Sequence, residues 1–254
     1  MNIKNSRQKL ETASAILFAL LIWQGASLLV GNRLLLVPPL VVLRVLSGLI
    51  LTGSFWNAVA YSWLRITAGF LLALGTGTVL AVLAGRFHLA EILLKPWMSA
   101  VKATPVAAFI ILCLIWLNAR SLSIFIAFLM VLPVVYTNLL QGIRSTDRKL
   151  LEMAAVFDLG RWRRVHYIYL PQIRPYLISA CAIAIGLSWK AGIAAEVIGI
   201  PDGSIGERLY EAKVYLNTGD LFAWTIAIVA VSLVFEKFFI LALRQMLPGK
   251  EPHP

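Results

Sequence analysis

Residues 150–171 read LLEMAAVFDLGRWRRVHYIYLP, a charged segment between two long apolar stretches. The wider segment 144–174 holds seven Lys or Arg and three Asp or Glu residues, in a chain that is 60% hydrophobic and 14% charged. Asp147 is placed to cap a short helix, because a side-chain oxygen there can accept from the first free backbone amides. The apolar stripe of that helix has i, i+4, i+7 spacing and consists of Leu150, Ala154 and Phe157.

A second helix is predicted directly after the first. Gly160 provides a turn, and Pro171 begins the next apolar stretch. Between them, one side of the predicted helix carries Trp162, Val165 and Tyr169. A pair of amphipathic helices on a membrane face is a suitable shape for docking into the groove of a partner.

The composition is that of a membrane protein. The mean hydropathy is +0.83, well above that of soluble domains. Six stretches approach the roughly 20 apolar residues that a membrane-spanning helix needs. The third is short and begins at Thr104-Pro105, so we expect it to be tilted, broken or only partly spanning. The predicted spans lie near 12–31, 66–85, 103–119, 121–143, 175–196 and 221–243 of a single transmembrane domain, 1–254.

The distribution of basic residues predicts the orientation. With the N-terminus in the cytoplasm, the inner segments 1–11, 86–102, 144–174 and the tail from 236 hold sixteen Lys or Arg residues. The outer segments hold six, and Lys190 lies within a span. The positive-inside rule therefore predicts that both termini are cytoplasmic (N-in/C-in), with the charged loop on the same side.

Several other classes of function find no support in the sequence. The net charge of +11 is spread over helix ends and inner loops, which fits anionic lipid headgroups better than a nucleic acid. Cys113 and Cys181 lie within predicted spans and have no disulfide or metal-ligand spacing. No catalytic grouping and no phosphate-binding loop is found, so we expect no enzyme activity, no metal and no cofactor bound by this chain.

The charged loop resembles the cytoplasmic loop of ABC importer permeases. The pattern in that family is Glu-Ala-Ala, three residues, Gly, nine residues, Ile, one residue and Leu-Pro. Two positions of this chain depart from it: Met153 replaces the first Ala, and Asp158 stands at the Gly position, for which we expect Gly160 to supply the backbone freedom. The matching positions are Glu152, Ala154, Ile168, Leu170 and Pro171.

Further segments resemble the nitrate, sulfonate and taurine branch of these permeases. They are Ser62 to Phe70, Val37-Pro38-Pro39, Thr104 to Trp116, and Trp189 to Asp220. The resemblance implies the type I importer permease fold, an all-α membrane protein of six transmembrane helices. It also implies cytoplasmic ATPase subunits that use ATP and magnesium, an external solute-binding protein and a bacterial inner (plasma) membrane location. The permease would form a homodimer with a second copy, or a pseudo-dimer with a similar chain. Residues of the loop would then transmit force and perform no chemistry.

Lys190 is the candidate residue of the translocation pathway. A Lys in the middle of a span costs roughly 2.5–3.5 kcal/mol on insertion scales, so it is expected to face water, a carboxylate or the bundle interior. It can attract an anion such as a sulfonate along a path that also includes Trp189 and Glu196, or pair with Glu196 of the same or a neighbouring subunit.

The function predicted is that of the membrane-spanning permease of an ATP-driven importer for a small solute, with a sulfonate-, nitrate- or taurine-like anion favoured. A vitamin precursor such as a pyrimidine is the alternative substrate. The alternative function is an ion channel or secondary transporter without an ATPase, although neither embedded carboxylate pairs nor inverted repeats are evident.

Overall fold

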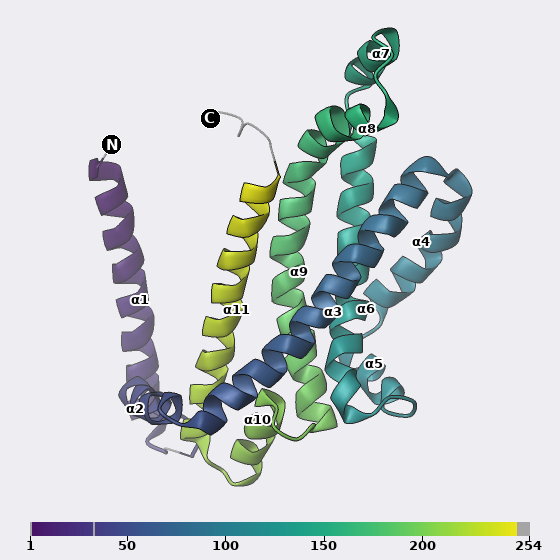
Figure 1. Cartoon of the computed structure of the whole chain (residues 1–254). Helices are drawn as coiled ribbons and strands as arrows, with labels where there is room; N and C mark the ends of the chain where they lie inside the picture. The colour runs from purple at the N-terminus through teal and green to yellow at the C-terminus, as the bar shows by residue number, and fades with distance from the viewer. Residues whose placement is uncertain (1, 33, 248–254) are drawn as a thin grey trace.

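The computed structural model describes residues 2–32 and 34–247, and these contain helices, turns and bends but no strand. Two of the basic residues that predict the orientation, Arg33 and Lys250, lie outside the described residues, as does His253. Four long helices cross most of the molecule in addition to the N-terminal one (Figure 1). The five are α1 (Asn2–Val30), α3 (Gly53–Arg86), α6 (Ala119–Arg144), α9 (Leu170–Gly199) and α11 (Thr218–Met246).

Helices α3, α6 and α9 form the centre of the bundle because small residues let them approach closely. A Cβ added to Gly192 of α9 would lie 2.6 Å from Cγ1 of Ile66 in α3. A Cβ on Gly77 of α3 would lie 2.9 Å from Cγ1 of Val135 in α6. Such contacts supply the close backbone packing that holds helices together in lipid.

Helix α1 lies at the edge of the molecule and carries many exposed apolar side chains (Figure 1). Trp23 of α1 contacts Phe222 of α11, with ring centroids 5.5 Å apart. The short helix α2 (Pro39–Ile50) begins at a proline and lies across the end of the bundle opposite α7. Helix α10 (Ile205–Val214) lies at that same end.

The predicted third span, 103–119, is broken, which is one of the forms expected from Thr104-Pro105. The structure has α4 (His88–Ala103) and α5 (Val106–Cys113), which meet at 101°. The physical reason is Pro105, which lacks an N–H and disfavours helical backbone at the residue before it. Thr104 accordingly has ψ 129°. The segment 86–102, predicted as an inner segment, is mostly the helix α4. With the bent pair α4 and α5 counted as one span, the structure has six apolar spans in place of five.

The charged loop contains α7 (Arg148–Val156), α8 (Arg161–Arg164) and a π-helical turn, η1 (Val165–Tyr169). The turn runs directly into α9, so the predicted second helix is continuous with the following span. Leu170 N–H donates to the Val165 carbonyl, which is the i to i+5 bond of a π-helix. This wider turn immediately precedes Pro171, whose ring would clash with a carbonyl of a regular α-helix.

Candidate functional site

Helix α7 projects beyond the end of the bundle (Figure 1). Asp147 caps it by accepting from the Lys149 amide at 2.9 Å, as the sequence predicted. The Asp147 amide in turn donates to Oε1 of Gln172 at 2.8 Å. Because Gln172 lies in the first turn of α9, this bond ties the start of α7 to the start of the fourth long helix.

Helix α7 ends in a Schellman motif, which requires one residue with left-handed backbone. The Leu159 amide donates to the Ala154 carbonyl at 2.9 Å, and the Asp158 amide donates to the Ala155 carbonyl at 3.2 Å. Asp158 has φ 46°, whereas Gly160 has φ −54° and extended backbone. The expectation that Gly160 supplies the backbone freedom is therefore wrong: Asp158 itself takes the conformation that glycine favours.

The motif residues divide into a buried pair and an exposed surface. Ala154 and Ile168 are buried, at 0% and 4% exposure, whereas Glu152, Asp158 and Gly160 are exposed. Leu170 and Pro171 are half-buried. The loop also exposes six large apolar side chains, which we call the loop apolar surface: Met153, Val156, Phe157, Trp162, Val165 and Tyr167.

The predicted faces of the two loop helices are only partly those observed. Ala154 and Phe157 were predicted to share one apolar stripe, but Ala154 is buried whereas Phe157 is 71% exposed, and Trp162 of the second helix is 81% exposed. The α-helical spacing that grouped Trp162 with Val165 and Tyr169 is interrupted by the π turn, and Ile168 is buried instead. Large apolar side chains that stay exposed beyond the bundle are typical of a surface that a partner covers.

Glu196 is fully buried near the end of α9, far from the charged loop. Its Oε2 accepts from Ser62 Oγ at 2.6 Å and from the Gly206 amide at 3.4 Å. Ser62 Oγ also accepts from the Ile205 amide at 3.0 Å. These bonds join α3, α9 and the first turn of α10, where the Glu196 Cβ leaves no room for a side chain on Gly206. The sequence predicts no role for Ser62, because its partner Glu196 lies 134 positions away in the chain.

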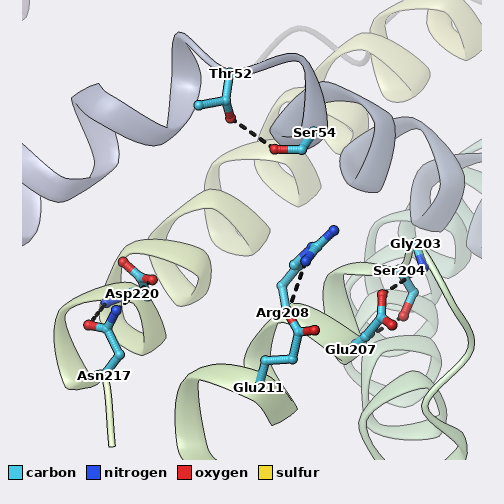
Figure 2. A network of polar contacts seen from close by, with 9 residues as sticks. All are labelled: Thr52, Ser54, Gly203, Ser204, Glu207, Arg208, Glu211, Asn217 and Asp220. Carbon is cyan, nitrogen blue, oxygen red and sulfur yellow. Dashed lines mark hydrogen bonds and ion pairs between the residues drawn. The ribbon is translucent and has the colours of Figure 1, made fainter. Parts of the chain in front are cut away.

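A polar network and a cavity of about 230 Å³ lie beside α10 and the start of α11. Figure 2 shows Arg208 paired with Glu211 at 2.9 Å, and Asn217 donating to Asp220 at 2.8 Å. Ser204 caps α10 by accepting from the Glu207 amide. The α10–α11 turn contains another residue with left-handed backbone, Leu216, with φ 54°. This end of the molecule is therefore polar and well ordered by local hydrogen bonds.

The three predicted pathway residues have different surroundings. Trp189 is buried, at 2% exposure, and Glu196 is bound by α3 and α10, so neither lines an open surface. Lys190 is exposed. The ion pairs among the described residues are His88–Glu91, Arg144–Glu91 and Arg208–Glu211, so the predicted pairing of Lys190 with Glu196 is not formed within the chain.

The described residues hold no group of three or more metal-ligating side chains. Cys113 and Cys181 are both buried free thiols. Three features are candidates for function. The helix α7 projects at one end of the molecule with the loop apolar surface, and Lys190 is exposed on α9. At the other end lies the polar, hydrogen-bonded region of α10. This arrangement can bind partners at its ends and can offer a charge to a solute, and none of it forms a nucleophile–base pair.

Comparison with known proteins agrees with this geometry. The putative aliphatic sulfonates transport permease protein SsuC of Bacillus subtilis (strain 168) is 28% identical over 235 residues, covering 91% of this chain and 84% of the relative. The bicarbonate transport system permease protein CmpB of Synechococcus elongatus is 28% identical over 256 residues, covering 93% and 90%. The nitrate import permease protein NrtB of Leptolyngbya laminosa is 28% identical over 242 residues, covering 91% and 84%.

The family described as "binding-protein-dependent transport system inner membrane component" matches residues 73–248, from the middle of α3 to the end of α11. This confirms the family that the loop motif predicted, and with it an all-α, multi-pass membrane protein that acts as an importer permease. The chain therefore belongs to the binding-protein-dependent transport system inner membrane component family, the permeases of ABC importers.

Proposed function

We propose that two copies of this chain form the pathway of an ATP-driven importer for a small anion. ATPase subunits dock on α7 and the loop apolar surface, and an external solute-binding protein delivers the anion at the opposite end. The observation that carries the proposal is the position of α7, which projects beyond the bundle (Figure 1). The large apolar side chains of the loop apolar surface are exposed there.

The loop is suited to transmitting force because it is rigid at both ends of α7. The Asp147–Gln172 bond fixes its start to α9, and the Schellman motif at Asp158 fixes its end. A displacement of α7 by a docked ATPase therefore moves the start of α9 as well. Glu152, Met153, Asp158 and Gly160 are exposed and available to contact the ATPase, while Ala154 and Ile168 hold the loop together from inside.

The bias of basic residues supports an orientation with both termini and α7 in the cytoplasm. ATP is then bound with magnesium and hydrolysed on the ATPase subunit, and this chain binds no cofactor. Lys190 supports an anionic solute, since an exposed ammonium group within a span needs water or a counter-charge. The relatives' names point the same way, because they specify aliphatic sulfonates, bicarbonate and nitrate.

The experiment is copurification of the tagged chain from its native host in mild detergent, with its partners identified by mass spectrometry. Val156→Asp places a charge on an 83% exposed position of the loop apolar surface. We expect this variant to lose the ATPase subunit while folding normally, because an ionised carboxylate in a buried apolar contact costs several kcal/mol.

Tyr215→Asp is the matched control. Tyr215 is 79% exposed in the turn after α10, at the opposite end of the molecule, so the ATPase subunit should be retained. Recovery of the wild-type chain without an ATPase, together with solute flux that needs no ATP, would contradict the proposal and favour a channel or secondary transporter.

A further inference from the structure

The break in the third span places a second lysine on an exposed face of the bundle. Lys102 lies in the last turn of α4, directly before the 101° bend between α4 and α5. Its side chain is exposed, and Nζ donates to Oγ1 of Thr137 in α6 at 3.3 Å. Thr137 is seven residues before the last residue of α6, Arg144, so it lies about 10 Å inside that end of the helix.

The same region of the bundle holds Lys190. The two valines that flank the break, Val101 and Val106, pack in one apolar cluster with three residues of α9 around Lys190. Those three residues are Leu187, Ala191 and Ala194. The end of α4 and the turn of α9 that carries Lys190 are thus neighbours through a shared apolar cluster, although 88 positions separate the two lysines in the sequence.

The packing of α6 on α9 gives the offset between the two lysines along the bundle. A Cβ on Gly142 would lie 3.0 Å from Tyr176, and a Cβ on Gly199 would lie 2.8 Å from Leu122, so the two helices run antiparallel. This register places Thr137 opposite Ile183, seven residues from Lys190. Lys102 Nζ is therefore displaced from the Lys190 position by about 10 Å along the bundle, towards α7.

Neither lysine has a counter-charge within the described residues, since their ion pairs all involve other groups. An ammonium group at this depth is costly unless it meets water or an anion. We propose that Lys102 is a second anion-contacting residue of the translocation pathway, which receives a small inorganic or organic anion that has passed Lys190. This inference rests on the proposed function and adds a residue and a direction to it.

A structural role for Lys102 predicts something different. A lysine in the last turn of a helix stabilises that helix through the helix dipole, and the hydrogen bond to Thr137 would add to this. Such a lysine need not influence the electrostatic potential at residue 190. The test therefore measures that potential directly, with charged thiol reagents as probes in place of a transported solute.

The experiment uses Lys190→Cys in membrane vesicles that contain the complete transporter, at low ionic strength. The new thiol is labelled with anionic sulfonatoethyl methanethiosulfonate and with its cationic trimethylammonium counterpart, and the ratio of the two rates is measured. The chain without the substitution gives the background, because Cys113 and Cys181 are buried. The ratio is then measured again after adding Lys102→Gln, Lys102→Arg or Lys95→Gln.

We expect Lys102→Gln to lower the anion-to-cation rate ratio by up to about fourfold. That is the effect, at the dielectric constant of water, of removing one unit charge about 10 Å away, which is the axial offset of the two lysines. Lys102→Arg should keep the original ratio. Lys95→Gln should lower the ratio less, by at most about twofold, because Lys95 is an exposed residue of α4 two turns further from the break.

Equal ratios in the Lys102→Gln and Lys95→Gln variants would overturn the inference. So would a Lys190→Cys thiol that reacts with neither reagent, because the two lysines would then share no water-filled path. Both results leave the copurification of the ATPase intact, so failure of this inference is distinguishable from failure of the proposed function.

Discussion

Asp158 is the residue on which the end of α7 depends. An L-residue in the left-handed region costs roughly 1–2 kcal/mol, less for Asp and Asn, whose short polar side chains bond to nearby backbone. Asp158 takes φ 46° in a tight C-terminal motif, whereas Gly160 has an ordinary φ and open space around its Cα. Position 158, and not position 160, is therefore the one that requires a left-handed backbone conformation.

We predict that Asp158→Gly keeps ATPase binding and stability, and that Asp158→Val lowers stability by about 1–2 kcal/mol, because a β-branched residue is strained at positive φ. Gly160→Ala should be tolerated, since a Cβ there meets nothing within 4 Å. Thermal unfolding in detergent, followed by circular dichroism, measures these differences. A destabilised Gly160→Ala together with an unaffected Asp158→Val would contradict this account.

Helix packing in the centre of the bundle depends on positions where a side chain would collide with a neighbouring helix. Gly192 of α9 is such a position because Ile66 of α3 fills the space beside it. Gly186, on the same helix, has nothing within 4 Å. Gly192 therefore allows close packing of two helices, whereas Gly186, six residues earlier, does not.

We predict that Gly192→Ala destabilises the bundle by about 1–3 kcal/mol, the usual cost of overpacking. Gly186→Ala is the matched control and should be neutral or slightly stabilising, because alanine favours a helix over glycine. Adding Ile66→Val to Gly192→Ala should recover a small part of the loss, because it removes Cδ1, which lies 3.0 Å from the added Cβ, while Cγ1 at 2.6 Å remains. Melting temperatures in one detergent test this, and equal effects at both glycines would refute it.

In a single copy of the chain, Lys190 is exposed although it lies in a membrane-spanning helix. In lipid, the exposure of its ammonium group would cost free energy. A second copy that encloses this face, with water or solute between the two, removes the cost. We predict that the complex in mild detergent contains two copies of this chain, measured by native mass spectrometry. A stable, active complex with one copy, or one in which the second permease is a different chain, would contradict the homodimer.

Much of this protein could be predicted from sequence because two signals are local. Apolar length identifies spans, and the spacing of Glu152, Ala154, Ile168, Leu170 and Pro171 identified the family that the comparison confirmed. The cap at Asp147 was predicted for the same reason, since it depends on residues two positions apart. Periodicity failed where the backbone is irregular, at the π turn before Pro171. The break before Pro105 was among the forms expected for the third span, because the effect of proline on the backbone is also local.

The all-helical membrane fold, the charged loop and the family can be predicted from local sequence, because hydropathy and motif spacing are properties of neighbouring residues. The enclosure of Glu196 by α3 and α10, and the exposure of Lys190 on the same helix, become evident only from the packing of the folded chain. Within a membrane every face of a helix is apolar, so periodicity does not tell which face meets another helix. That choice is made by close packing between segments far apart in the chain.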